Sequence, residues 1–181
     1  MRAALSRWIL TRLEQHTPDV LCRLEAQILT NLAAHGFGMP VCRVWHLPAP
    51  EALRAYAAYT VECMTETKAD PKRLYDSALR LGKRLHRITG FTEQEDIQRL
   101  IFYLYRNIRI TMHGALPGEI TVSSCYFSGF YSPEQCRLMS HVDAGIMAGL
   151  SGGGDLRFTQ RLTEGCGQCT AVFLKEGSQH E

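Results

Sequence analysis

Four of the seven cysteines lie in the last third of the chain, and their thiols are the side chains best suited to chemistry. They are Cys125, Cys136, Cys166 and Cys169. In a reducing compartment, cysteines serve as metal ligands, nucleophiles or core residues far more often than as disulfides. The sequence therefore predicts a thiol-lined site in this region, and it names no substrate. The other three cysteines are interpreted as structural.

Cys136 is expected at the start of a helix. Ser132 and Gln135 have the spacing of a capping box, which places Cys136 in the first turn of a helix that ends near Leu150. Free N–H groups at a helix start favour a thiolate, with a pKa of about 3.5–7.5. We predict that Cys136 is the most acidic thiol, with Asp143 on the same helical stripe as an acid/base or positioning group. The alternative is a boundary core cysteine and a solvated carboxylate.

Cys166 and Cys169 form a C-x-x-C motif across a glycine-flanked turn. Such a pair can hold a metal from a knuckle or cycle between dithiol and disulfide. A thioredoxin-like site is excluded because a strand follows the motif here, where that fold needs a helix. Thiolates from Cys125, Cys136, Cys166 and Cys169 could together bind one metal ion. The alternative for Cys169 is a side chain that faces the core.

Arg157 and Arg161 project from the same face of a predicted strand. Their guanidinium groups could bind a substrate carboxylate through paired hydrogen bonds. A solvated sheet face is the commoner explanation of such a pattern.

Apolar residues recur at helical spacing from residue 5 to residue 106. Asp70 and Pro71 supply an N-cap and a proline at the first helical position, and Gly90 closes the same helix. Thr92 and Glu95 have the spacing of a capping box for a further helix. This part of the chain is therefore expected to be helical.

After residue 107 the apolar residues recur at every second position. Ile108, Ile110 and Met112 alternate with polar residues, as do Leu156 and Phe158 further along. Two strands are expected before the cysteine-bearing helix and two after it, with short connections at both ends. Such an order favours an antiparallel sheet.

The predicted fold is α+β, with an N-terminal helical half packed against a C-terminal ββαββ antiparallel sheet unit. The helical region is expected over 1–106, the cysteine-bearing ββαββ region over 107–176 and a frayed tail over 177–181. The length suits one compact unit.

Topology brings three cysteines to one edge of that sheet. The second strand ends at Cys125, the helix begins at Cys136 and the last strand begins near Cys169, so we expect one shared site with Cys166 at its rim. Side-chain alternation argues against an inward-facing Cys125, because Cys125 is two residues from the polar residue Ser123 and so projects from the same face of the strand. A bulge near Ser123 would turn Cys125 inwards.

Composition excludes some classes of partner. The formal net charge is +2, which is too small to indicate nucleic acid or an anionic membrane. No stretch approaches the roughly 20 apolar residues of a membrane-spanning helix, and the N-terminus lacks the apolar core of a signal peptide. We therefore expect a cytoplasmic protein whose partner is a small-molecule ligand, with neither nucleic acid nor membrane involved.

The last third of the chain resembles the L-2-amino-thiazoline-4-carboxylic acid hydrolase-like family, and it is similar to 4-vinyl reductase domains. The resemblance rests on a cysteine that ends a strand, a helix with a cysteine and an aspartate, and a cysteine that opens the last strand. These residues are Cys125-Tyr126, Cys136, Asp143, 156–158, Glu164-Gly165 and 169–173. A similar cysteine-bearing order occurs in iron-containing carotenoid isomerases.

The hydrolase-like resemblance implies cleavage of a small heterocyclic or amide-like carboxylate. It assigns Cys136 or Cys169 as nucleophile or metal ligand, Asp143 as acid/base, and Arg157 or Arg161 as carboxylate anchor. The 4-vinyl reductase resemblance implies instead a small-molecule-binding module whose cysteines hold zinc. A metallochaperone is the third alternative. Whether the chain is an enzyme stays open, and zinc or iron is the candidate cofactor.

Overall fold

The structure is a computed structural model that describes residues 2–15 and 19–175. The predicted frayed tail, 177–181, lies outside the described residues. Across the described residues the chain forms six α-helices, two short 3₁₀ helices and one four-stranded sheet, so the predicted α+β class is confirmed.

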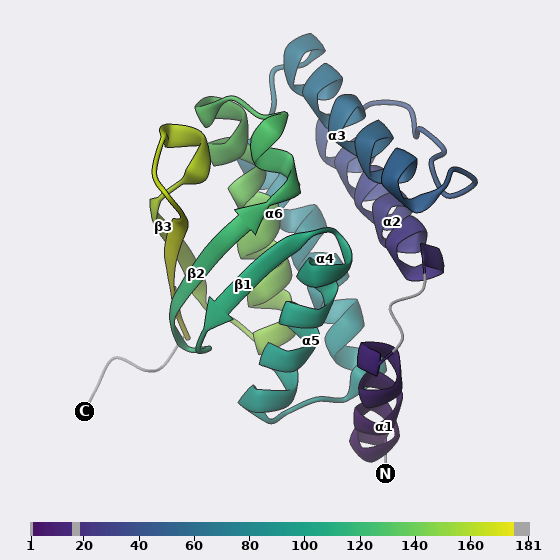
Figure 1. The fold of residues 1–181 in the computed structure, drawn as a ribbon, viewed down its shortest axis with the longest axis vertical. Helices are drawn as coiled ribbons and strands as arrows, with labels where there is room; N and C mark the ends of the chain where they lie inside the picture. The colour runs from purple at the N-terminus through teal and green to yellow at the C-terminus, as the bar shows by residue number, and fades with distance from the viewer. Residues whose placement is uncertain (1, 16–18, 176–181) are drawn as a thin grey trace.

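The helices come mostly before the strands in the chain (Figure 1). The α-helices are α1 Arg2–Gln15, α2 Asp19–Phe37, α3 Ala49–Glu66, α4 Pro71–Thr89, α5 Gln94–Asn107 and α6 Pro133–Ser151. The strands are β1 Ile110–Gly114, β2 Gly118–Cys125, β3 Asp155–Gln160 and β4 Cys169–Leu174. The 3₁₀ helices are η1 Tyr126–Gly129 and η2 Leu162–Glu164. Within the described ranges, no helix combines the length and the apolar character needed to cross a membrane.

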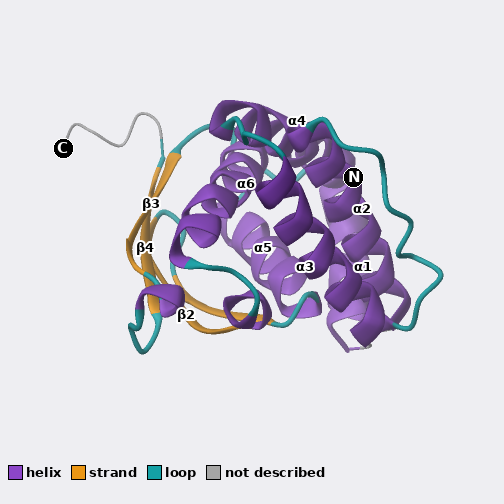
Figure 2. Ribbon diagram, turned by 90° about the horizontal axis from the view of Figure 1, so that it is seen from above, coloured by secondary structure: helices purple, strands orange, loops and turns teal. Residues whose placement is uncertain are grey.

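The strands lie in the order β1-β2-β4-β3 and every neighbouring pair is antiparallel. Helix α6 connects β2 to β3, so the predicted ββαββ order is confirmed. Figure 2 shows that the helices cover one face of the sheet only. The strands accordingly alternate between buried and accessible residues, and the core forms between this face and the helices.

Local capping residues start two of these helices as predicted. The Asp70 side chain accepts a hydrogen bond from the backbone N–H of Lys72 at 2.9 Å. Both bonds of the capping box between Ser132 and Gln135 are present. The capping box predicted at Thr92 is wrong, because α5 begins at Gln94 and Thr92 therefore lies outside the N-cap position.

Glycines bring α6 unusually close to α4. A Cβ atom added at Gly82 would lie 2.4 Å from the carbonyl oxygen of Ile146, and one added at Gly145 would lie 2.5 Å from that of Tyr75. Hydrogen at these positions is therefore what allows the two helix backbones to touch. This contact fixes the position of α6, which carries Cys136 and Asp143.

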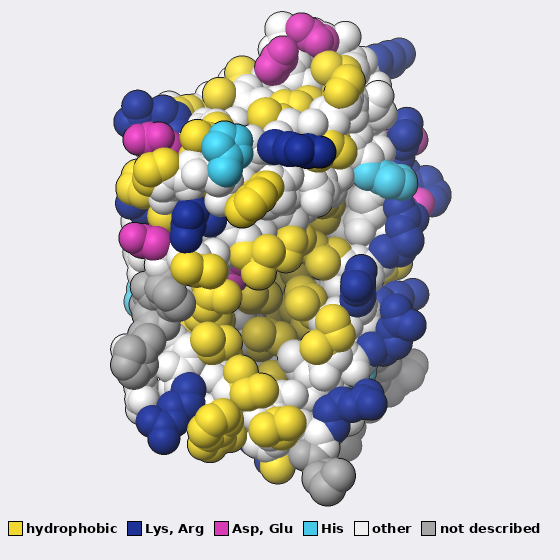
Figure 3. Space-filling model, turned by 90° about the vertical axis from the view of Figure 1, so that its right-hand side faces the viewer, with side chains coloured by type: hydrophobic (Ala, Val, Ile, Leu, Met, Phe, Trp, Pro, Cys, Tyr) yellow, Lys and Arg dark blue, Asp and Glu magenta, His cyan; other side chains and the backbone are white. Residues whose placement is uncertain are grey.

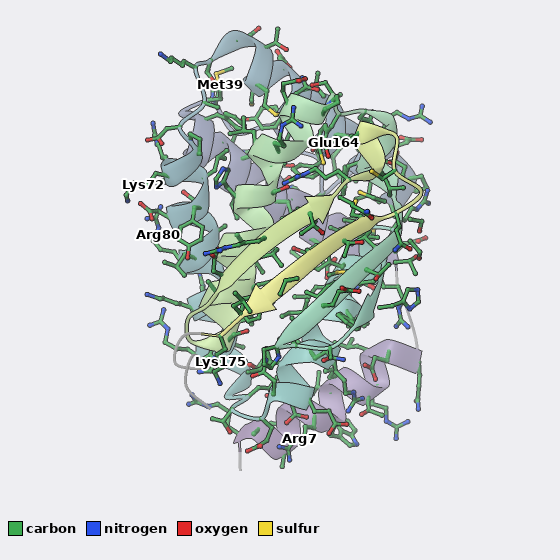
Figure 4. The ribbon with its side chains drawn as sticks, turned by 90° about the vertical axis from the view of Figure 1, so that its left-hand side faces the viewer. Arg7, Met39, Lys72, Arg80, Glu164 and Lys175 are labelled. Atoms are coloured by element: carbon green, nitrogen blue, oxygen red, sulfur yellow. The ribbon has the colours of Figure 1, made fainter. Side chains whose placement is uncertain are left out.

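The outer face of the sheet is turned towards the viewer in Figure 4. Glu164, labelled there, lies in η2 at one end of the sheet. Its carboxylate accepts a hydrogen bond from Arg137, so an ion pair joins this end of the sheet to the first turns of α6. The ion pair thus links α6 to η2, the segment that precedes β4.

Candidate functional site

A cavity of about 170 Å³ lies between the helices and the end of the sheet where β2 finishes and β4 begins. Most of its wall is aliphatic, from side chains on α2, α4, α5 and α6. Among these side chains are Ile28, Leu81, Leu85, Leu104, Val142 and Ile146. Ile28 is 36% exposed, so the cavity reaches the surface beside α2. Figure 3 looks onto the α2 and α3 side, where hydrophobic side chains gather around a hollow.

Asp143 is one of two carboxyl groups in the cavity wall. The Tyr105 hydroxyl donates a hydrogen bond to Asp143 Oδ1 at 2.7 Å. Burial raises the pKa of Asp143 to about 6, against the opposing effects of this hydrogen bond and of the Arg161 charge. Asp143 is therefore a half-buried group of the cavity wall, and the solvated-carboxylate alternative is wrong.

Glu25 is the second carboxyl group of the wall, and it comes from α2. The Asn107 side-chain amide donates a hydrogen bond to Glu25 Oε1 at 3.0 Å, while Oε2 is buried and has no partner among the residues that the structure describes. Burial raises the pKa of Glu25 to about 8 in spite of the Asn107 bond. Among the described residues the wall includes no lysine, arginine or histidine, so the formal charges that these residues give the wall near neutral pH are negative.

Glu25 was missed by the sequence interpretation. The available signal was its position within the apolar stripe of α2, four residues after Leu21 and three before Ile28. A carboxylate at such spacing lies on the buried face of its helix.

Three of the predicted cysteines line this one cavity. They are Cys125, Cys136 and Cys169, while Cys166 is outside the lining. Cys125 turns inwards because the pairing of β1 with β2 shifts by one residue at Ser123, which is the bulge that the alternation required. The sequence thus predicted the edge of the sheet that these cysteines share, and the bulge turns the Cys125 side chain towards the cavity at that edge.

The predicted acidity of Cys136 is wrong. Its pKa is raised, and burial is the largest cause. Burial also raises the pKa of Cys169 and takes that of Cys125 to about 12. The apolar wall therefore outweighs the start of the helix, and all three groups are thiols near neutral pH.

The predicted metal site is also wrong. Among the residues that the structure describes, no group of three or more His, Cys, Asp or Glu side chains is placed to hold a metal ion. Cys125, Cys136 and Cys169 line the cavity without forming such a group, and Cys169 Sγ accepts a hydrogen bond from the Leu162 backbone N–H at 3.3 Å. The zinc or iron site predicted from Cys125, Cys136, Cys166 and Cys169 therefore has no support.

The two predicted arginines lie in different surroundings. Arg157 has a side chain that is 72% exposed, and its Nε donates to Asp155 at 2.6 Å, outside the cavity. The Arg161 side chain is 15% exposed and its guanidinium lies 4.9 Å from the centre of the Phe158 ring. Arg161 lowers the pKa of Asp143 through its charge without lining the cavity. Of the two, only Arg161 is near the site.

An aromatic wall closes another part of the cavity. Phe127 and Tyr131 are stacked with ring centres 5.8 Å apart, and Tyr56 meets Phe127 edge-on at 5.5 Å. The Tyr131 hydroxyl is held 2.7 Å from the Thr60 hydroxyl. No sequence pattern indicated this aromatic group, because its members come from α3 and from the segment around η1.

Alkylation with iodoacetamide is expected to label Cys42 before Cys136. Cys42 is exposed, whereas Cys136 is partly buried with a raised thiol pKa, so at about pH 8 its rate should be at least tenfold lower. Peptide mass spectrometry over time measures both rates in one sample. A Cys42→Ser variant checks that the slow signal belongs to Cys136, and equal rates for the two thiols would contradict the expectation.

Comparison with known proteins gives one family match. No curated protein matches the chain, but the model of the phosphotransferase enzyme family matches residues 2–117. The resemblance to the L-2-amino-thiazoline-4-carboxylic acid hydrolase-like family and to 4-vinyl reductase domains is therefore wrong. It rested on short motifs in the last third, whereas the match covers α1 to α5 and β1.

The functions that this resemblance implied are therefore wrong as well. A cysteine-dependent hydrolase has no support from the family match, and neither has a metal-binding module or metallochaperone. The match spans more than half of the 181 residues, and the chain belongs to the phosphotransferase enzyme family.

Proposed function

We propose that the chain binds a small, mainly apolar organic molecule in the cavity between α2, α4, α5 and α6. The observation that carries this proposal is the aliphatic and aromatic wall around about 170 Å³ of space. An engineered apolar cavity of about 150 Å³ binds benzene, so a ligand of about that size fits.

Polar groups in the wall would orient such a ligand. The Tyr105–Asp143 pair lies on the cavity, and Tyr131 presents a hydroxyl whose partner is Thr60. A few polar groups within an apolar wall are the usual composition of a small-molecule site. The proposal includes a cytoplasmic location, because all seven cysteines are free thiols, and it involves neither nucleic acid nor membrane.

The family's name implies a phosphoryl donor such as a nucleotide. The cavity does not fit the phosphates of a nucleotide, because its wall contains Glu25 and Asp143 and, within residues 2–15 and 19–175, no cationic side chain. A phosphate group placed among these carboxylates would be repelled and would lose its hydration. No phosphoryl-transfer step follows from the geometry of this cavity.

An Ile28→Trp variant is expected to bind a small neutral probe at least about tenfold more weakly than the natural chain. Ile28 lines the cavity and is partly exposed, so a larger ring can fill the opening without overpacking the core. Isothermal titration calorimetry with benzyl alcohol measures the affinity.

Leu24→Trp is the matched control for this experiment. Leu24 lies one turn earlier on α2, is 51% exposed and is not part of the wall, so its affinity for benzyl alcohol should stay unchanged. If the natural chain binds no benzyl alcohol, or if both variants weaken binding equally, the cavity is not the binding site.

A further inference from the structure

We propose that the cavity selects small amines, with the apolar body of the amine inside the wall and its ammonium group bound by the carboxylate of Glu25. The inference rests on the proposed function, since it names the chemical class of the ligand that the same cavity binds.

The charges of the wall favour a cation. Glu25 and Asp143 line the cavity, and no lysine, arginine or histidine of the described chain does. In surroundings of low polarity, a charge is stable only beside an opposite charge. An ammonium group would find two carboxyl groups here that can each carry the opposite charge. A neutral ligand would bind with Glu25 protonated and gain no charge pairing, and an anionic ligand would be repelled by Asp143.

Hydrogen bonding assigns the ammonium group to Glu25. Asn107 already holds Glu25 Oε1, while Oε2 is buried and has no partner among the described residues. Buried carboxylate oxygens without a partner are rare, and each calls for an explanation. Asp143 differs because neither of its oxygens is among the buried atoms without a hydrogen-bond partner in the described part of the chain, and Tyr105 donates to its Oδ1 at 2.7 Å. An ammonium group carries three N–H donors and makes strong charge-assisted bonds to a carboxylate.

Binding of an amine at Glu25 must release a proton. The pKa of Glu25 is about 8 in the free protein, so at pH 7 this carboxyl group is mostly protonated. The ligand enters as an ammonium ion, the Glu25 O–H bond breaks, and its proton passes to the buffer as the carboxylate pairs with the ligand. The expected release at pH 7 is about 0.9 proton per ligand.

Other ionisable groups around Glu25 do not replace it in this role. Cys22 on α2 and Tyr103 on α5 interact with the Glu25 charge, and the pKa of each is raised by burial. Arg109 interacts with Cys22. Both Cys22 and Tyr103 are therefore neutral near pH 7, and Glu25 is the member of this group that changes charge when a cation arrives.

Calorimetry with three probes of similar shape tests the inference: benzylamine, benzyl alcohol and benzoate. At pH 7 we expect benzylamine to bind at least about tenfold more tightly than benzyl alcohol, with benzoate the weakest. Benzylamine affinity should rise about tenfold from pH 6 to pH 7, as Glu25 becomes easier to ionise. Buffers of different ionisation enthalpy should report proton release for benzylamine and none for benzyl alcohol.

Two variants decide which carboxyl group binds the amine. Glu25→Gln keeps an acceptor for Asn107 and should still bind benzyl alcohol, while losing the preference for benzylamine and the proton release. Asp143→Asn should keep most of the preference for benzylamine and most of the proton release. Loss of the preference in Asp143→Asn alone would overturn the assignment to Glu25. If benzyl alcohol binds and benzylamine binds no better, the inference fails while the proposed function stands; if neither binds, the proposed function fails.

Discussion

Gly149→Ala is expected to destabilise the protein by about 3 kcal/mol, the upper part of the usual range for overpacking a core. The added Cβ would lie 2.6 Å from the Leu79 carbonyl oxygen, 2.7 Å from the Lys83 nitrogen and 2.8 Å from the Gly82 Cα. All three are backbone atoms, so no change of rotamer relieves the clash, and α6 must move away from α4. Urea denaturation followed by circular dichroism measures the loss as a lower midpoint.

Gly167→Ala is the control for this variant. A Cβ at Gly167 would meet nothing within 4 Å, so the free energy of unfolding of this variant should match that of the natural chain within about 0.5 kcal/mol. Because α6 carries Asp143 and Cys136, Gly149→Ala should also weaken benzyl alcohol binding. An unchanged midpoint for Gly149→Ala would show that α4 and α6 are not packed backbone to backbone.

The stability of the natural chain is expected to fall as the pH rises from about 5 to about 8. The pKa of Glu25 is raised from 4.5 to about 8, so in this interval the folded state holds a proton that the unfolded state has released. Stability therefore decreases with pH, by up to about 1.4 kcal/mol for each pH unit, and levels off above the folded pKa. Asp143, whose pKa is raised to about 6, adds to the same loss of stability in the lower part of this pH range.

Glu25→Gln should remove most of this slope and should be the more stable protein at about pH 9, by roughly 2–4 kcal/mol. The reason is that glutamine can still accept the Asn107 hydrogen bond and has no charge to bury. Urea titrations of both proteins at about pH 5, 7 and 9 measure the difference. If the free energies of unfolding of the two proteins change with pH in the same way, the Glu25 carboxyl is hydrated in the folded state.

The sequence by itself determined the elements and their order. Asp70 and Ser132 start helices through bonds to nearby backbone N–H groups, which depend on neighbours within three residues. The alternation at Leu156 and Phe158 marked β3 for a similar local reason. Short connections between strands then left an antiparallel sheet as the expected arrangement, and the cysteines at the ends of these elements were expected to share an edge.

The chemistry of the site was decided by the tertiary structure. Position in the first helical turn predicted an acidic Cys136, yet apolar side chains from other elements surround the thiol and raise its pKa. The sequence left two alternatives for Asp143, a site group or a solvated charge, and Tyr105 on α5, which donates to its carboxylate, decided between them. Glu25 and Asp143 are separated by more than 100 residues in the chain and meet in one cavity wall. Helical and strand periods specify which residues share a face, but the pKa of a group on that face depends on what packs against it, and distant segments supply that environment.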